Sequence, residues 1–464
     1  MRKTKIICTI GPVTSSFDML SAMAEAGMDV VRLNMSHGDH ESHSKIIKSI
    51  KTLNQKIKYP IPLLLDTQGP EIRTGNLKEN IELKDGDVVT VAARNVKVEE
   101  SSIPINYDDI VDAVAIDDII TVDNGLINLQ VLSKKDKTMK CKVIDGGTLK
   151  SRRHVNLPGI HVNLPAITKK DKEDIEFGIA QEVDFIALSF VRQASDVREL
   201  KALLGDKKDK IKIIAKIEDQ EGVRNIDQIL NEVDGVMVAR GDLGVEIRVE
   251  ELPNVQRLLV RKCHERGKRC IVATHLLESM IQNPIPTRAE VTDVANTIYE
   301  EVDAIMLSGE TTVGKYPIKC IEYLDKIAQT SEKEESLNLS KNLVKETDKQ
   351  HLAHSAVELA ESLGAVGIVV ITRRGLMANY VTNCRPFKTP IYAFTNDSRT
   401  RRVLALNRNV IANRLTFSSE PEKTLHNAFL ALKAREGLES GDKVVVISDV
   451  IADTGVDAIQ IRSL

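Results

Sequence analysis

Three charged residues near the middle of the chain have the types and spacing that phosphoryl chemistry needs. Lys216 and Glu218 lie two positions apart at the end of an apolar run, so in a strand their side chains point the same way. Asp242 follows the next apolar run. Two carboxylates on neighbouring strands suit Mg²⁺ or Mn²⁺ and leave coordination sites open for a substrate. The lysine would place a fixed cation beside a transferring phosphoryl group.

Other polar residues also follow short apolar runs directly. Arginines offer forked donors to phosphate or carboxylate oxygens, and glycines let backbone amides approach an anion closely. Hydroxyl, amide and carboxyl oxygens can surround a cation. The residues concerned are Arg32, Asn34, Ser36, Asp66, Thr67, Arg73, Gly241, Gly244 and Thr274.

Each of these residues also has an ordinary structural explanation. A Lys-x-Glu pair on a strand is usually a surface pair, and the Asp of Arg-Gly-Asp-Leu-Gly is also a plausible helix cap. The oxygen-bearing residues Asn34, Ser36, Asp66 and Thr67 suit caps and turns, and histidines such as His37 and His275 are structural by default. The functional interpretation therefore depends on all of them meeting at one rim.

The apolar runs themselves predict the scaffold that would bring these residues together. Continuous β-branched runs are typical of parallel strands covered on both faces, and helical segments such as 171–181 and 194–204 separate them. Eight strand–helix units make a closed (β/α)₈ barrel, in which functional residues lie at the carboxyl ends of the strands. The predicted strands are Lys5–Ile10, Val30–Met35, Pro62–Leu65, Phe185–Phe190, Ile211–Ile217, Gly235–Val238, Cys270–Ala273 and Ala304–Leu307.

Two further domains are predicted around this barrel. Hairpin turn signals between short runs predict an inserted β domain, with strands at Val88–Val91 and Ile119–Val122. After a charged connector, further β-α alternation predicts an open α/β domain with an edge strand at 458–464. We expect the barrel to comprise 1–69 and 160–335, the inserted β lid 70–159, and the C-terminal α/β domain 345–464.

Composition limits the remaining classes of function. A net charge of -3 over 464 residues does not suggest binding to nucleic acid or a membrane. The six cysteines are scattered without a C-x-x-C pair, which indicates reduced thiols rather than a zinc site or disulfide framework. The N-terminal apolar run is too short for a signal peptide or a span, so we expect a cytoplasmic protein.

Longer strings around these residues resemble the pyruvate kinase family. They include TKIICTIGP, RLNMSHG, DTQGPEIRTG, KIEDQEGV, ARGDLGVEI and VATHLLESM, and the resemblance runs from about Thr4 to Pro317. It implies transfer of the phosphoryl group of phosphoenolpyruvate to ADP, giving pyruvate and ATP as the final step of glycolysis. It also implies a homotetramer whose C-terminal domain carries an allosteric site.

The resemblance implies roles for individual residues. Lys216 would be the catalytic lysine, with Glu218 and Asp242 as ligands of Mg²⁺ or Mn²⁺. Phosphoenolpyruvate would contact Arg32, Gly241 and Thr274, with Lys216 and Asp242 beside it, and Thr274 lies where the proton source for the enolate is positioned. A potassium ion would be surrounded by Asn34, Ser36, Asp66 and Thr67. The nucleotide would meet Asn34, Arg73 and Arg153, beneath the closing lid.

Three departures from the family pattern affect these expectations. Gln68 stands where potassium-dependent members usually have Lys, but Thr67, Glu71 and Thr74 keep their pattern, so we expect activation by potassium. His154 replaces the usual Gly of KGVNLPG and tolerates fewer backbone conformations than Gly does.

The third departure lies in the C-terminal domain. The segment 372–378 loses two hydroxyl donors and gains Arg373 and Arg374, and 448–455 lacks the usual Gly-Thr-rich effector loop. We expect an atypical effector site at which fructose 1,6-bisphosphate is not a strong activator. Alternatively, the two arginines form a solvated or subunit-facing patch.

Two other classes of protein compete with this interpretation. A metal-dependent aldolase or lyase acting on oxo acids would also use a Glu/Asp pair and an arginine, but would not explain the lid or the C-terminal domain. A catalytically silent binding protein on the same scaffold would be expected to lose the lysine or a metal ligand, whereas all three residues are present.

Overall fold

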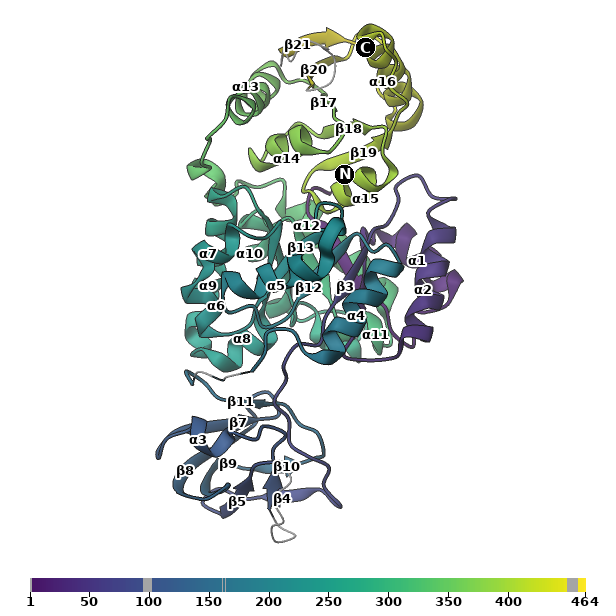
Figure 1. Cartoon of the computed structure of the whole chain (residues 1–464). Coiled ribbons are helices and arrows are strands. Elements are labelled where there is room, and N and C mark those ends of the chain that lie inside the picture. The colour runs from purple at the N-terminus through teal and green to yellow at the C-terminus, as the bar shows by residue number, and fades with distance from the viewer. Residues whose placement is uncertain (1, 95–101, 161, 163, 449–457) are drawn as a thin grey trace.

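The computed structural model describes residues 2–94, 102–160, 162, 164–448 and 458–464. Within these residues, eight parallel strands close into a barrel in the order β1-β16-β15-β14-β13-β12-β3-β2 (Figure 1). The predicted (β/α)₈ barrel and all eight predicted strands are therefore confirmed. The barrel strands are β1 Lys5–Thr9, β2 Val30–Asn34, β3 Leu63–Asp66, β12 Phe185–Leu188, β13 Lys212–Ile217, β14 Gly235–Ala239, β15 Arg269–Ala273 and β16 Ala304–Leu307.

The strands are apolar throughout because the barrel buries both of their faces. On β13, Ile214 belongs to the cluster inside the barrel, whereas Ile213 and Ala215 belong to the cluster between strands and helices. On β15, Ile271 points inward and Val272 outward in the same way. Both clusters exclude water. Successive residues of a strand therefore alternate between the two apolar clusters, and the sequence shows no alternation of apolar with polar residues.

Helices surround the barrel, and local sequence fixes where several of them begin. Thr168 and Asp171 form a capping box at the start of α4, and Thr287 and Glu290 form another at α10. The barrel helices are α1 Phe17–Ala26, α2 His40–Leu53, α4 Lys169–Ala180, α5 Ala194–Leu204, α6 Gln220–Arg224, α7 Ile226–Leu230, α8 Arg240–Glu246, α9 Leu252–Glu265, α10 Arg288–Tyr299, α11 Gly309–Thr312 and α12 Pro317–Ser331.

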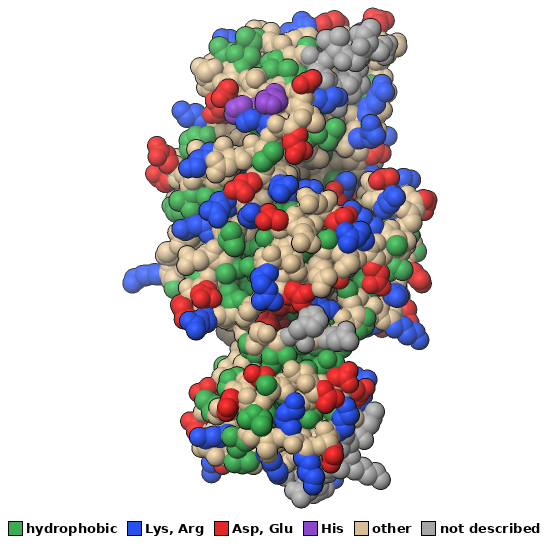
Figure 2. Space-filling view, turned by 60° about the vertical axis from the view of Figure 1, so that its left-hand side comes forward, with side chains coloured by type: hydrophobic (Ala, Val, Ile, Leu, Met, Phe, Trp, Pro, Cys, Tyr) green, Lys and Arg blue, Asp and Glu red, His purple; other side chains and the backbone are tan. Residues whose placement is uncertain are grey.

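The chain between β3 and α4 forms a separate β-rich body with its own apolar core. Its main sheet has the order β11-β7-β8-β9-β5-β6, and β10 pairs with β4. We call this β-rich body the lid. The space-filling view shows a narrow waist between the lid and the barrel (Figure 2). Its elements are β4 Ile81–Leu83, β5 Val88–Ala92, β6 Ile103–Pro104, α3 Ile110–Ala113, β7 Ile119–Val122, β8 Ile127–Lys135, β9 Thr138–Asp145, β10 Gly147–Leu149 and β11 Val155–Asn156.

The C-terminal part forms an open sheet of order β19-β18-β17-β20-β21, in which β21 pairs antiparallel to β20 at the edge. The predicted α/β pattern and its edge strand are confirmed. Between α12 and this sheet lies a connector with one short 3-10 helix at Leu339–Asn342. The elements are α13 Asp348–Leu363, β17 Gly367–Ile371, α14 Leu376–Asn383, β18 Ile391–Thr395, α15 Ser398–Val403, β19 Val410–Arg414, α16 Pro421–Glu436, β20 Lys443–Ser448 and β21 Ala458–Ser463.

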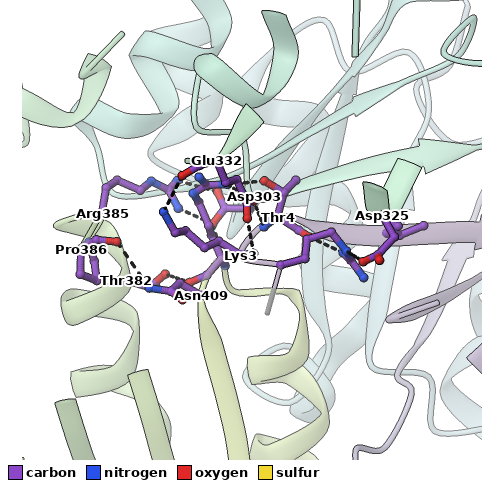
Figure 3. Close-up of polar contacts among 12 residues, drawn as sticks. Lys3, Thr4, Asp303, Asp325, Glu332, Thr382, Arg385, Pro386 and Asn409 are labelled. Carbon is purple, nitrogen blue, oxygen red and sulfur yellow. Dashed lines mark hydrogen bonds and ion pairs between the residues drawn. The ribbon is translucent and has the colours of Figure 1, made fainter. Parts of the chain in front are cut away.

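Buried ion pairs join this sheet domain to the amino ends of barrel strands (Figure 3). Asp303, just before β16, is fully buried and accepts two hydrogen bonds of 2.8 Å from Arg385 and one of 2.9 Å from Arg269. Burial opposes ionisation of this carboxyl, but the two guanidinium groups outweigh it and lower the pKa of Asp303. Glu332, just after α12, lies 3.3 Å from Arg408 of the C-terminal domain and accepts 2.7 Å bonds from the backbone amides of Lys3 and Thr4, just before β1.

An apolar side chain from the C-terminal domain also completes the barrel core. Leu406 is fully buried in the same interior cluster as Ile7, Val30 and Ala304, and Val403 packs against that cluster. The amino end of the barrel is therefore filled from outside the barrel sequence. The carboxyl end of the barrel lies on the side of the lid (Figure 1).

We expect Leu406→Ala to destabilise the protein by about 3 kcal/mol, because it removes a fully buried side chain and leaves a cavity. Thermal unfolding should show a midpoint lower by several degrees. The matched control is Leu430→Ala on α16, since Leu430 is 51% exposed and should barely shift the midpoint. Equal midpoints for the two variants would contradict the role assigned to Leu406.

Candidate active site

The side chains that point into the barrel change from apolar to charged at the carboxyl ends of the strands. On β13, Lys216 follows the interior residue Ile214 by two positions, so it also points inward. The same spacing from interior residues directs Thr9, Arg32 and Asp66 inward on β1, β2 and β3. The candidate site is thus the top layer of the barrel interior.

Lys216 lies at the centre of this layer. Its Nζ is 3.1 Å from Asp66 Oδ1 and 3.1 Å from Glu218 Oε1, and it donates a hydrogen bond of 2.7 Å to Ser189 Oγ. Burial disfavours the charged ammonium, but the carboxylates of Asp66 and Glu218 outweigh it and raise the pKa of Lys216 above its usual value. The lysine is therefore a fixed positive charge at neutral pH.

Arg32 supplies a second cation on the other side of Asp66. Its Nε donates to Asp66 Oδ2 at 2.6 Å, and its Nη1 donates to Thr9 Oγ1 at 2.8 Å. Asp66 is fully buried, which would raise its pKa, but Arg32 and Lys216 together lower it. One carboxylate thus holds two cations close together, with donors left for an anionic ligand.

Glu218 and Asp242 form a pair of carboxyls beside the lysine. Glu218 Oε2 accepts a hydrogen bond of 2.7 Å from the backbone amide of Phe190, and its Oε1 lies 3.1 Å from Lys216 Nζ. Burial raises the pKa of Glu218 to about 7, against the lowering effect of Lys216, and burial also raises the pKa of Asp242. Neighbouring carboxylates supply the hard oxygen donors that Mg²⁺ and Mn²⁺ prefer, so this donor pair fits either ion.

Thr274 and Gly241 meet at the next edge of the mouth. The backbone amide of Gly241 donates to Thr274 Oγ1 at 2.8 Å. Thr274 and His275 have φ values of 70° and 54°, a left-handed conformation that is unfavourable for a β-branched residue. Arg240 holds this turn, because its Nη2 donates to the Thr274 carbonyl oxygen at 2.6 Å. Local strain retained by such contacts is common at functional sites.

The four residues expected around potassium lie at the adjoining ends of β2 and β3. Asn34 and Asp66 are directly paired across the two strands, and the Ser36 amide donates to Asn34 Oδ1 at 3.2 Å. Thr67 Oγ1 accepts a hydrogen bond of 3.0 Å from the Ser189 amide. The structure therefore brings this set together at one edge of the mouth.

Arg73 and Arg153 lie where the chain passes between barrel and lid. Arg73 Nε is 2.7 Å from Glu71 Oε2, which also accepts a 3.0 Å bond from Gln68. Arg153 Nη1 is 3.3 Å from Asp123 within the lid. Among the described residues, no hydrogen bond or ion pair joins either arginine to Lys216, Glu218 or Asp242. Their side chains contact residues of the lid and of its connection to the barrel instead.

Sequence reasoning missed several residues that complete the site. Ser189, Thr9 and the Phe190 amide each contact a charged site residue, and Arg240 supports the Thr274 turn. Ser189 and Thr9 had a usable signal, since each stands two positions after an interior strand residue. The contacts of Arg240 and of the Phe190 amide depend on loop conformation and carry no such signal.

These features define a class: a (β/α)₈-barrel enzyme with an inserted lid and a mouth suited to an anionic substrate. Comparison with known proteins narrows the class. The chain matches the family model "Pyruvate kinase, barrel domain" over residues 1–321 and "Pyruvate kinase, alpha/beta domain" over residues 350–461.

Individual relatives agree with these models. The chain is 42% identical over 451 residues to pyruvate kinase isozyme G, chloroplastic, of Nicotiana tabacum, covering 96% of this chain and 80% of the relative. It is 44% identical over 465 residues to pyruvate kinase of Geobacillus stearothermophilus, covering 98% of this chain and 79% of the relative. The chain belongs to the pyruvate kinase family and is a phosphotransferase.

No helix in the described part of the chain is both long and apolar enough to cross a bilayer.

Proposed function

We propose that the barrel mouth transfers the phosphoryl group of phosphoenolpyruvate to ADP, giving pyruvate and ATP. The observation that best supports this is the buried charge cluster, in which Lys216 stands 3.1 Å from both Asp66 and Glu218, with Arg32 on the far side of Asp66. Such a cluster offers rigid cations to a multiply charged anion. Family membership supports the choice of substrates over those of an oxo-acid aldolase or lyase.

In this reaction an oxygen of the ADP β-phosphate attacks phosphorus, and the bond from phosphorus to the enol oxygen of phosphoenolpyruvate breaks. Lys216 and Arg32 offset the charge on the phosphoryl oxygens and on the enolate that departs. Addition of a proton to the methylene carbon of the enolate gives pyruvate. Gly241 and Thr274 hold the substrate, and Thr274 is placed to position the proton source.

Two cations complete the proposed site. Glu218 and Asp242 would hold Mg²⁺ or Mn²⁺, which supplies Lewis-acid stabilisation of phosphoryl oxygens when bound. The potassium ion would rest among the oxygen atoms of Asn34, Ser36, Asp66 and Thr67, next to the phosphoryl group. Asp66 links the two proposed cation sites, because it is paired with Asn34 across β2 and β3 and lies 3.1 Å from Lys216.

The nucleotide would enter from the lid side, where Arg73 and Arg153 face its phosphates and Asn34 adjoins it. Closure of the lid would exclude water from the reaction. The same proposal includes the domain boundaries, which are 1–69 and 160–335 for the barrel, 70–159 for the lid and 345–464 for the C-terminal domain. Family resemblance supports the homotetramer, and the short N-terminal apolar run supports the cytoplasmic location.

Replacing Lys216 by Met should lower kcat by about a thousandfold, because it removes the central cation while keeping the length of the side chain. Binding of Mn²⁺ and of phosphoenolpyruvate should remain largely intact. A coupled assay of ADP-dependent pyruvate release provides the rate, and titration calorimetry provides the binding. Lys212→Met, at the opposite end of the same strand, is the matched control. An active Lys216→Met enzyme would overturn the proposal.

Activity should depend on potassium. Arg73 and Gln68 both donate hydrogen bonds to the Glu71 carboxylate. Arg73 is the cation among these three side chains, and because it is paired with Glu71 it does not replace the monovalent ion. Exchanging potassium for tetramethylammonium at constant ionic strength should reduce the initial rate strongly. An unchanged rate would show that the Asn34–Thr67 edge does not need the ion.

The effector site is expected to differ from that of family members with a hydroxyl-rich loop. After β17, Thr372 is buried and its Oγ1 accepts the Gly375 amide at 3.2 Å, while Arg373 and Arg374 are exposed. The other half of the expected site, 449–455, lies outside the described residues.

Fructose 1,6-bisphosphate should therefore leave the half-saturation concentration for phosphoenolpyruvate nearly unchanged. Steady-state assays with and without the sugar bisphosphate, and with other sugar phosphates and nucleotides, measure this directly. A large fall in half-saturation with the bisphosphate would refute the prediction.

A further inference from the structure

Two residues of one lid strand contact two residues of one barrel helix. Asn156 Nδ2 donates a hydrogen bond of 2.9 Å to Glu246 Oε1, and His154 Nδ1 lies 3.4 Å from Asp242 Oδ1. Residues two apart on a strand share a face and are about 6.6 Å apart, and residues four apart on a helix share a face at about 6 Å. The strand segment that ends in β11 therefore matches α8 at two points.

The Asn156–Glu246 contact is buried at the waist between lid and barrel. Asn156 is 5% exposed, and its Oδ1 has no hydrogen-bond partner although it is buried. Both residues line a cavity of about 120 Å³ between the two bodies. The end of the helix is held as well, because Gln220 Nε2 donates to the backbone oxygen of Glu246 at 2.6 Å.

The carboxyl of Glu246 suits a neutral hydrogen-bonding role. Burial raises its pKa to about 7, against the lowering effect of Asn156, and the nearby carboxylates of Asp219 and Asp242 raise it further. A neutral carboxyl can accept from the amide nitrogen of Asn156 and also donate to its unpaired oxygen. Gln has the same shape and the same pair of functions, so it is a conservative replacement at this position.

The two partners of this contact belong to opposite halves of the proposed reaction. The first turn of α8 contains Gly241 and Asp242, which are proposed to hold phosphoenolpyruvate and the metal. The strand segment that leads into β11 follows Arg153, and within it His154 pairs through its backbone with Arg73. Both arginines are proposed to face the nucleotide. A shift of this strand along α8 would therefore move the nucleotide relative to the phosphoryl donor.

We propose that Asn156 and Glu246, supported by the second contact from His154 to Asp242, form a clasp that fixes the lid against α8 and aligns ADP with the phosphoryl group. Asn156 and Glu246 are positioning residues, since they act through α8 and the lid strand. The inference rests on the proposed function of Arg73, Arg153 and Asp242. Phosphoryl transfer tolerates little misalignment of attacking and departing oxygens, so a loosened clasp should act mainly on kcat.

The experiment is a double-mutant cycle on the full-length enzyme with Asn156→Ala, Glu246→Ala and both together. Each single variant should lower kcat about tenfold, the scale of a lost buried hydrogen bond, and the double variant should be no slower than the singles. Phosphoenolpyruvate binding measured without nucleotide should stay unchanged. Glu246→Gln should keep most of the activity, because its amide can still accept from Asn156 Nδ2 and can donate to Asn156 Oδ1.

The matched control is Asn128→Ala. Asn128 Nδ2 also donates to a carboxylate, that of Asp145 at 2.8 Å, but both residues belong to the lid. This variant should leave kcat unchanged. If Glu246→Ala does not fold, Asn156→Ala and Glu246→Gln still test the proposal.

Three results would overturn the clasp: unchanged kcat in folded Asn156→Ala, the same loss in Asn128→Ala, or fully additive losses in the double variant. A lower thermal midpoint with unchanged kcat would assign the pair a purely structural role. Failure of the proposed reaction is distinguishable, since it would appear as activity in Lys216→Met, whereas failure of the clasp leaves that variant inactive.

Discussion

The central interaction of this molecule is the burial of a lysine among carboxylates at one end of a closed barrel. Lys216 stays charged there only because Asp66 and Glu218 lie 3.1 Å away, and Asp66 stays ionised only because Arg32 and Lys216 flank it. Removing water makes each of these charges costly alone and strongly coupled together. The barrel supplies the rigid frame that holds the groups at these distances.

The two ends of the barrel differ in what fills the interior and in which domain they adjoin. At the amino end, the interior is completed by Leu406, and the buried ion pairs Asp303–Arg385 and Glu332–Arg408 attach the C-terminal domain. At the carboxyl end, the interior layer is polar and opens toward the lid. The barrel strands thus run from the docking surface of the C-terminal domain to the mouth on the side of the lid, so packing at one end supports geometry at the other.

The proposed clasp lies at the waist between lid and barrel, where the lid must be able to move and the two substrates must be aligned. Across it, Asn156 meets Glu246 and His154 meets Asp242 with the spacing that a strand and a helix have in common. Movement of a lid requires a weakly packed connection, whereas in-line transfer requires exact placement of two substrates. Two polar contacts on α8 would meet both requirements, because they fix the position of the lid strand and bury less apolar surface than a large interface would.

The sequence by itself determined the eight strands, the inserted β-rich body, the C-terminal sheet and most of the charged residues of the mouth, because apolar periodicity and strand ends are local properties. Ser189, Thr9, Arg240 and the Phe190 amide were not predicted, although they complete the charge network. The plug by Leu406 and the pairing of Asn156 with Glu246 were not predicted either. Such contacts join residues far apart in the chain, and only closure of the barrel and docking of its two neighbours decide which of them meet.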